Sequence, residues 1–221
     1  MFEPGLDLKP SDSPDALIES ILLKDGKYFL LRRHLNRLKK SAGYFGVKTD
    51  FKNLKLGLKK QAALSKKGRA RKVRVLVFSG GEVKVEGKDI SVKKPADNRV
   101  AISKVKTDSS NILLYHKTTK RELYDSEYGK WSGKGYYDVL FTNEKGELTE
   151  AHSSNIVVKI GRKYFTPPVK SGLLAGTYRG YLMEKPEFML KEKTLFPSDL
   201  KKADAVFLCN SVRGLRQVRV G

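Results

Sequence analysis

The spacing of apolar residues in the first half of the chain predicts strands that alternate with two helices. Alternating positions on either side of Asp25-Gly26, a dipeptide typical of tight turns, predict a hairpin. The period then becomes helical until Gly46, and Asp50 opens a second helical stretch that stops before Gly68. The expected elements are strands at 16–20 and 27–31, helices at 35–45 and 50–67, and strands at 72–78 and 82–86.

The second half of the chain is dominated by short strand patterns with turn residues between them. Asn143-Glu144-Lys145-Gly146 and Gly161-Arg162 are turn sequences, so the strands that flank them predict a meander. A helix is expected from Thr177, and it must end near Pro186 because proline cannot continue a helix. The expected strands are 99–104, 137–142, 146–151, 155–160, 163–166 and 205–209.

Together these patterns predict an α+β protein with two lobes. The lobes are expected at residues 1–105 and 106–221, with the polar stretch Thr107-Asp108-Ser109-Ser110 at the crossing. A chain of 221 residues has room for two small lobes, and its 39% hydrophobic residues are enough for a sizeable core. That composition argues against a disordered chain.

Cysteine usage and hydropathy bear on the compartment. Cys209 is the single cysteine, so no internal disulfide can form. The first residues lack the basic flank and long apolar stretch of a signal peptide. No run approaches the roughly 20 apolar residues that a membrane helix requires. We therefore expect no membrane association and place the protein in the cytoplasm.

The chain is strongly basic, with 45 Lys and Arg against 24 Asp and Glu and a formal net charge of +21. Such a charge attracts polyanions, but it is distributed in scattered pairs and not in one block. No zinc-finger spacing or RNA-binding aromatic signature accompanies it, so we expect no nucleic-acid partner. A solvated basic surface also suits a small anionic substrate. The pairs are Lys39-Lys40, Lys59-Lys60, Lys66-Lys67, Lys93-Lys94 and Lys201-Lys202.

Candidate chemistry is concentrated at the ends of predicted elements. Lys117 stands between a strand-like and a helix-like run, and Glu150 follows thirty-three residues later. An amine and a carboxylate with small polar residues nearby are what a protein needs to hold an aldehyde cofactor. Gly176-Thr177 before a helix can bind a phosphate, and an ordinary capped loop has the same sequence. We predict no metal site.

Taken in order, these segments resemble the class IV aminotransferase family of pyridoxal-phosphate enzymes, and within it the aminodeoxychorismate lyases. The resemblance extends from about Ala16 to the C-terminus, and the segments are specific in combination and in order. They are Leu17-Ile18-Glu19-Ser20, His34-Leu35-Asn36-Arg37-Leu38, Tyr115-His116-Lys117-Thr118-Thr119, Glu150-Ala151-His152-Ser153-Ser154-Asn155, Gly176-Thr177-Tyr178-Arg179 and Asn210-Ser211-Val212-Arg213-Gly214.

The resemblance implies a role for each candidate residue. Lys117 would carry pyridoxal 5'-phosphate covalently and move protons, and Glu150 would face the pyridine nitrogen of the cofactor. The phosphate would be bound by Arg37, by the backbone at Thr177 and Tyr178, and by the Ser211 hydroxyl. Two weaker assignments are Asn155, beside the ring, and Arg213, as a substrate-binding residue.

The resemblance also implies a fold and an activity. The fold has a small N-terminal α/β sandwich and a larger C-terminal domain with a barrel-like sheet, with the cofactor between them. The implied reaction is conversion of 4-amino-4-deoxychorismate to 4-aminobenzoate and pyruvate, a step of folate biosynthesis, in a homodimer that has aminodeoxychorismate synthase as a partner. Two alternatives stay open: a branched-chain or D-amino-acid aminotransferase, and a non-catalytic polyanion-binding protein on the same scaffold.

Overall fold

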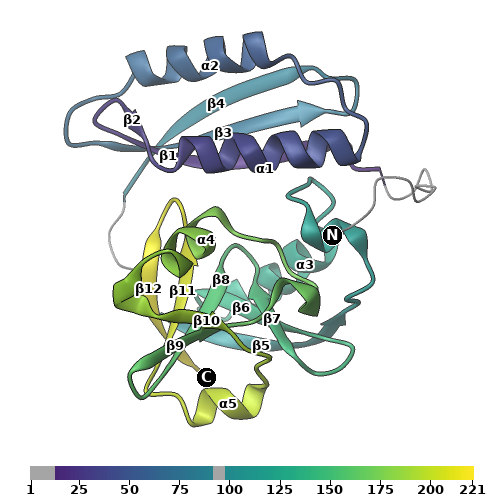
Figure 1. Ribbon diagram of the computed structural model, residues 1–221, viewed down its shortest axis with the longest axis vertical. Coiled ribbons are helices and arrows are strands. Elements are labelled where there is room, and N and C mark those ends of the chain that lie inside the picture. The colour runs from purple at the N-terminus through teal and green to yellow at the C-terminus, as the bar shows by residue number, and fades with distance from the viewer. Residues whose placement is uncertain (1–12, 92–97) are drawn as a thin grey trace. The chain divides into compact units, whose positions relative to one another are not determined.

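The computed structural model describes residues 13–91 and 98–221, which form two compact units (Figure 1). Unit 1 is the described part of Met1–Val92 together with His116–Lys120. Unit 2 is the described part of Lys93–Tyr115 together with Arg121–Gly221. The chain therefore returns to unit 1 for five residues in the middle of unit 2.

Unit 1 is an antiparallel four-stranded sheet in the order β2-β1-β3-β4, with two helices packed on one face. Inward side chains of β1 and β3, such as Ile21 and Val75, form a core with Leu38 and Leu54 of the helices. Burial of these aliphatic side chains is the main stabilisation of the unit. The elements are β1 (Ala16–Lys24), β2 (Lys27–Tyr28), α1 (Leu31–Tyr44), α2 (Phe51–Ala63), β3 (Ala70–Phe78) and β4 (Val83–Ile90).

The turn and the helix start predicted for unit 1 are confirmed, but one predicted strand is too long. Asp25 and Gly26 both have positive φ, at 49° and 73°, as a two-residue hairpin turn requires. Asp50 caps α2 by accepting a hydrogen bond of 2.9 Å from the Asn53 backbone N–H. The strand expected at 27–31 is too long, because Leu30 adopts a left-handed φ of 54° and α1 begins at the next residue.

Unit 2 is built on an eight-stranded sheet in the order β10-β9-β8-β11-β12-β5-β6-β7. A further pairing of β7 with β8 closes six of these strands into a ring, so the predicted α+β fold with a barrel-like sheet is confirmed. The strands are β5 (Arg99–Thr107), β6 (Asp138–Asn143), β7 (Leu148–Ala151), β8 (Asn155–Ile160), β9 (Lys163–Thr166), β10 (Leu190–Glu192), β11 (Ala205–Asn210) and β12 (Gly214–Val220).

Short helices surround this sheet, and the core of the barrel is aliphatic. Inward residues such as Leu140, Ile156 and Leu208 are almost fully buried in it. The helical elements are η2 (Ile112–Tyr115), α3 (Glu122–Ser132), η3 (Val169–Ser171), α4 (Thr177–Met183), η4 (Pro186–Phe188) and α5 (Pro197–Lys201).

The two units differ from the lobes expected at 1–105 and 106–221. Strand β5 pairs with both β6 and β12, so it belongs to unit 2, and a boundary at residue 105 would cut it. The polar stretch Thr107-Asp108-Ser109-Ser110, expected at the crossing, lies inside unit 2. The hydrophobic pattern located the strand but not its partners, which lie far away in the sequence.

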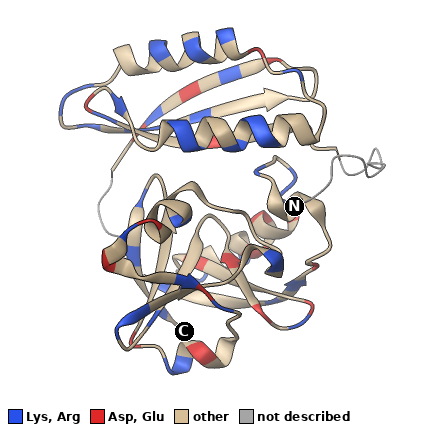
Figure 2. Cartoon of the chain, viewed as in Figure 1, with Lys and Arg blue, Asp and Glu red and all other residues tan. Residues whose placement is uncertain are grey.

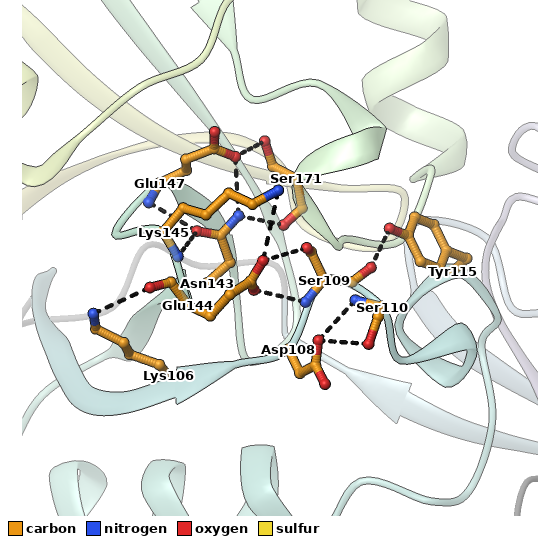
Figure 3. A network of polar contacts seen from close by, with 10 residues as sticks. All are labelled: Lys106, Asp108, Ser109, Ser110, Tyr115, Asn143, Glu144, Lys145, Glu147 and Ser171. Carbon is orange, nitrogen blue, oxygen red and sulfur yellow. Dashed lines mark hydrogen bonds and ion pairs between the residues drawn. The ribbon is translucent and has the colours of Figure 1, made fainter.

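Polar contacts hold the loop after β5 against the turn between β6 and β7 (Figure 3). The Ser109 backbone N–H and hydroxyl donate to the two carboxylate oxygens of Glu144, at 2.8 and 2.6 Å. The Tyr115 hydroxyl donates to the Ser109 carbonyl at 2.7 Å. Gly172 lies close to this loop, because an added Cβ would stand 2.9 Å from the Ser109 Cα. The contacts fix the segment that leads to Lys117.

A second polar contact is buried at the start of β6. The Oδ1 atom of Asp138 accepts from the backbone N–H groups of Val139 and His152, at 2.8 and 3.1 Å, and the Ser153 hydroxyl donates to Oδ2 at 3.3 Å. Burial raises the pKa of the Asp138 carboxyl to about 6, although these hydrogen bonds and Arg213 act in the opposite direction. Asp138 ties the turn that follows Glu150 to β6.

We predict that Asp138→Asn flattens the pH dependence of stability. Because the folded-state pKa is raised from 3.8 to about 6, the native state binds the proton more tightly, and wild-type stability falls as the pH rises through this range. The fall is on the order of 3 kcal/mol. An asparagine keeps the Oδ1 acceptor and does not ionise. Denaturant unfolding from pH 4 to pH 7 tests this, and an equal fall in the variant would contradict it.

We also predict that Gly172→Ala destabilises the fold by about 2–4 kcal/mol, because a side chain at a φ of +89° is strained and meets the Ser109 backbone. Gly161→Ala is the matched control. Gly161 has a φ of +60° but nothing within 4 Å of an added Cβ, so only the backbone strain of about 1 kcal/mol applies. Chemical unfolding of both variants measures the difference; equal losses would mean that Ser109 moves away at little cost.

Candidate functional site

Lys117 lies in a short extended segment that pairs with the beginning of β1 within unit 1. The Ile18 N–H donates to the Lys117 carbonyl at 2.8 Å, and the Thr119 N–H donates to the Ala16 carbonyl at 3.0 Å. The Thr119 hydroxyl accepts from the Ala16 N–H at 3.1 Å. These bonds fix the backbone on both sides of Lys117. The strand-like run expected before it is the 3₁₀ helix η2, and the helix-like run after it is α3.

The side chain of His116 fastens the same segment to the end of α1. Its Nδ1 atom lies 2.9 Å from the Ser41 hydroxyl, and its ring packs against Tyr44 and Phe45 with centroid distances of 4.6 and 4.8 Å. Burial lowers the pKa of His116 to about 4, so its imidazole is neutral at neutral pH. The residue before Lys117 is thus held by packing and one neutral hydrogen bond.

Glu150 is buried on β7 in unit 2, with two hydrogen-bond donors beside its carboxylate. The Tyr124 hydroxyl lies 3.3 Å from Oε1, and the Asn155 amide nitrogen lies 3.4 Å from Oε2. Burial, together with the charge of Glu150, raises the pKa of Tyr124, so its phenol stays protonated and can only donate to the carboxylate. Glu150 is therefore oriented by a residue of α3 and by its pairing partner on β8.

Asn155 also connects Glu150 to the segment that enters α4. Its amide nitrogen donates to the Leu174 carbonyl at 3.0 Å. A Cβ at Gly176 would clash with the Asn155 Oδ1, so any larger residue at position 176 would displace the Asn155 amide that contacts Glu150. Thr177, the first residue of α4, is buried at this point.

Ser211 lies in the turn between β11 and β12, which is fixed by Asn210. The Asn210 amide nitrogen donates to the Ser154 hydroxyl at 3.0 Å and to the Ser153 carbonyl at 3.2 Å. Its Oδ1 accepts from the Arg213 N–H at 2.8 Å. The turn that carries the buried Ser211 therefore lies beside the turn that follows Glu150.

The side chains of Tyr178 and Arg213 contact residues outside the set of predicted site residues. Tyr178 packs against the buried cluster formed by residues that include Val157, Leu182 and Cys209. The Arg213 guanidinium is exposed and donates to the Tyr137 hydroxyl at 3.3 Å. The backbone of residue 178 remains the part of that residue suited to an anion.

Arg37 lies on α1 in unit 1, and its guanidinium contacts the buried carboxylate of Glu19. The Nε and Nη2 atoms of Arg37 donate to Oε1 and Oε2 at 2.8 and 2.7 Å. The sequence placed Arg37 on the polar side of its helix, where solvent is the usual partner. The sequence does contain a signal for this contact, because Glu19 is a charged residue at an inward position of β1 and needs a buried partner.

Contacts within unit 2 thus link Glu150, Asn155, the start of α4 at Thr177 and the turn of Ser211. Within unit 1, neighbouring residues of β1 hold the backbone of Lys117 and the side chain of Arg37. Sequence reasoning gave no role to the residues that orient these groups. They are Glu19, His34, His116, Tyr124, Asp138 and Asn210.

The basic residues are spread over the helices and strands of each unit and do not form one block (Figure 2). Of the five lysine pairs, Lys93-Lys94 lies outside the described residues, and the other four are exposed. Among the described residues, no helix combines the length and hydropathy needed to cross a membrane.

Comparison with known proteins identifies the family. The family model described as "Amino-transferase class IV" matches residues 16–220. A Schizosaccharomyces pombe protein, provisionally named aminodeoxychorismate lyase, is 32% identical over 203 residues, which are 86% of this chain and 84% of that protein. Both matches extend over unit 1 and unit 2.

Solved structures share the fold over nearly the whole chain. A Mesorhizobium loti protein, provisionally named an amino-acid aminotransferase, has a TM-score of 0.85 at 27% identity, over 93% of this chain and 99% of that one. The PLP-bound form of a hypothetical aminotransferase from Mycobacterium tuberculosis has a TM-score of 0.80 at 19% identity, over 99% of this chain and 87% of that one. The second likeness shows the fold alone.

The donor set of this chain fits pyridoxal phosphate, the cofactor of that family. The chain carries the kinds of group that this cofactor needs. Lys117 has a primary amine for the aldehyde, and Glu150 has a buried carboxylate for the ring nitrogen. For the phosphate there are the Arg37 guanidinium, the Ser211 hydroxyl and the backbone at Thr177. With a family model that extends over both units and relatives of matching length, the chain belongs to the class IV aminotransferase family of pyridoxal-phosphate enzymes.

Proposed function

We propose that the protein is an aminodeoxychorismate lyase, which converts 4-amino-4-deoxychorismate to 4-aminobenzoate and pyruvate. The observation that carries this proposal is the 32% identity to the Schizosaccharomyces pombe protein provisionally named for that reaction, over 86% of the chain. The Asn210-Ser211-Val212-Arg213-Gly214 ending supports the lyase over the aminotransferases. A basic protein surface also suits a substrate with two carboxylates.

In this proposal the cofactor contacts follow the family resemblance. Lys117 would hold the aldehyde covalently, Glu150 would accept the hydrogen bond of the protonated ring nitrogen, and Arg37 would bind the phosphate. The remaining proposed contacts are Asn155, the backbone at Thr177 and Tyr178, and the Ser211 hydroxyl, with Arg213 as the substrate-binding candidate.

The chemistry requires a base at one carbon and a fixed charge at one nitrogen. When bound, the cofactor supplies a protonated pyridine ring that accepts the electron pair left by proton removal. The substrate amine would displace Lys117 from the aldehyde, and the freed Lys117 amine would remove the proton from the amine-bearing carbon of the substrate. A positioned base contributes about 10²–10⁴-fold to such a step. Cleavage of the neighbouring C–O bond then releases the enolpyruvyl group as pyruvate and leaves the aromatic ring of 4-aminobenzoate.

An amino-acid aminotransferase is the second candidate, because the Mesorhizobium loti structure with that provisional name has a TM-score of 0.85. It would use Lys117 and Glu150 in the same way and return the amino group to a 2-oxo acid. The two reactions therefore differ in their dependence on a 2-oxo acid. A homodimer and an aminodeoxychorismate synthase partner stay predictions of the family resemblance.

We predict that the purified protein, loaded with pyridoxal phosphate, releases 4-aminobenzoate from chorismate and glutamine in the presence of an aminodeoxychorismate synthase, with no 2-oxo acid added. Lys117→Ala should abolish product formation and also the covalent cofactor adduct found by borohydride reduction and mass spectrometry. Lys120→Ala, in the same segment, is the matched control and should retain both. Product at the rate of the synthase alone would overturn the lyase, and amino transfer to a 2-oxo acid would favour the second candidate.

We predict that Glu150→Gln leaves the protein folded but slows turnover at least about a hundredfold. A glutamine can accept from Asn155 and donate to the Tyr124 hydroxyl, so both contacts of 3.3 and 3.4 Å survive and the unfolding free energy should change by less than about 1 kcal/mol. A neutral amide cannot keep the ring nitrogen charged.

The matched control for this variant is Glu122→Gln, on the exposed side of α3. It should turn over at the wild-type rate. If Glu150→Gln instead lost cofactor but kept its rate per bound cofactor, Glu150 would be a structural residue of β7 and not the partner of the ring nitrogen.

A further inference from the structure

A carboxylate occupies a core position in the strand that holds Lys117. The inward side of β1 carries Leu17, Glu19, Ile21 and Leu23, and the three aliphatic residues form the core with the helices. Glu19 lies among them with 1% of its surface exposed. Burial of a charged carboxylate costs several kcal/mol unless close partners offset it, so this position needs an explanation that packing does not supply.

Among the described residues, the hydrogen-bond partners of the Glu19 carboxylate come from α1. Arg37 donates from Nε and Nη2 at 2.8 and 2.7 Å, and His34 lies with Nδ1 2.6 Å from Oε2. His34 and Arg37 are three residues apart and so lie on the same face of the helix. Burial by itself would raise the pKa of Glu19, but the Arg37 charge and the hydrogen bonds from His34 and Arg37 outweigh it and lower that pKa to about 2.

Glu19 is therefore an anion at neutral pH, and it can only accept hydrogen bonds, so Nδ1 of His34 must carry a hydrogen. With both oxygens engaged by Arg37 and a third donor from His34, the carboxylate itself cannot rotate. His34 is as deeply buried as Glu19, at 1% exposed, whereas the side chain of Arg37 is 14% exposed. Glu19 and His34 are therefore fixed in the core, and Arg37 is the member of the network that reaches the surface.

This arrangement fixes the plane of the Arg37 guanidinium. A bidentate contact to a carboxylate determines both the position and the orientation of the planar fork. A side chain that is already ordered loses less conformational entropy when it binds an anion. A contribution to stability does not account for the network, because a protein in which well-packed apolar residues replace a buried ion pair is often equally stable or more stable.

We propose that Glu19 and His34 are positioning residues, which hold the Arg37 guanidinium in the orientation in which it binds the phosphate of pyridoxal phosphate. The proposal rests on the proposed function in one respect, namely that Arg37 is the phosphate ligand. It assigns to the buried carboxylate of β1 an effect on cofactor affinity that acts only through Arg37.

The test compares two ligands that differ only in the phosphate. Pyridoxal phosphate and pyridoxal are titrated into apo-protein and followed by absorbance, for wild type, Glu19→Gln, Arg37→Ala and the double variant. Glu19→Gln should weaken the affinity for pyridoxal phosphate about tenfold, because the amide nitrogen of the glutamine would face the Arg37 donors. Loss of a residue that supports a metal ligand has an effect of this size at metal sites. Pyridoxal affinity should be unchanged.

The double variant separates a positioning role from a structural one. In the Arg37→Ala background, Glu19→Gln should cause no further loss of pyridoxal phosphate affinity, since the group through which it acts is absent. A second loss of the same size in that background, or an equal loss of pyridoxal and pyridoxal phosphate, would overturn the positioning role. So would tighter binding of pyridoxal phosphate by Glu19→Gln.

Two further variants complete the design. Glu19→Asp keeps the buried charge but withdraws it from the guanidinium by one methylene, and it should show the same selective loss if Glu19→Gln does not fold. Asp89→Asn is the matched control, because it neutralises the carboxylate of another Arg pair in unit 1, Arg71 with Asp89 at 2.6 Å, and should not alter either affinity. If Arg37→Ala failed to distinguish the two ligands, its phosphate role would be wrong, while the 4-aminobenzoate assay would still judge the lyase separately.

Discussion

The pairing of residues 117–119 with the first residues of β1 is the constraint on which unit 1 depends. Strand β2 covers only the far end of this edge of β1, at Leu23 and Lys24, so the stretch at residues 16–18 would otherwise expose unpaired backbone groups. The returning segment pairs with them, although almost a hundred residues separate the two in the sequence. Closing so long a loop costs little more than closing a short one, because the entropy cost grows only with the logarithm of length. The bonds that complete the sheet also fix the backbone of Lys117, and the next residue of β1, Glu19, holds Arg37.

Each of the two sheets has a buried carboxylate, Glu19 on β1 and Asp138 on β6. Their surroundings shift their pKa values in opposite directions. Glu19 has the Arg37 guanidinium and His34 as close partners, and their charge and hydrogen bonds lower its pKa to about 2 and keep it charged. Asp138 accepts hydrogen bonds from two backbone N–H groups and one hydroxyl, and its burial outweighs these bonds and the Arg213 charge and raises its pKa to about 6. One carboxylate therefore adds stability at neutral pH that is lost in acid, between about pH 4 and pH 2, whereas the other reduces stability as the pH rises toward 6. A protein can carry both because each also orients a neighbouring segment.

Local patterns predicted most of the fold, and contacts distant in sequence account for what they missed. The strands at 155–160 and 163–166 match β8 and β9 because they are bounded by turn residues and are rich in β-branched or aromatic side chains. Strand β12 was missed because it has only one buried residue, Val218, among charged neighbours. The motifs led to Lys117, Glu150 and Ser211, but the groups that orient them, such as Tyr124 and Asn210, are ordinary residues until the fold brings them close. The inward position of Glu19 in β1 signals that it needs a buried partner, but spacing along the chain does not identify Arg37 as that partner, because the two residues belong to different elements.

Lys117 and Glu150 cannot by themselves separate a lyase from an aminotransferase. Both reactions begin with removal of a proton from an amine-bearing carbon, and both need an amine and a carboxylate in the roles proposed for Lys117 and Glu150. The two reactions differ in the next step. In the lyase reaction the substrate loses a neighbouring C–O bond, whereas in the aminotransferase reaction its amino group passes to an acceptor. Selectivity must therefore come from side chains that orient the leaving group or admit a second substrate. In unit 2 the turn between β11 and β12 carries such side chains, because Asn210 anchors it beside the Glu150 turn while Arg213 extends from it to Tyr137. Changes in that turn would alter the reaction without disturbing the proton transfer that both enzymes share.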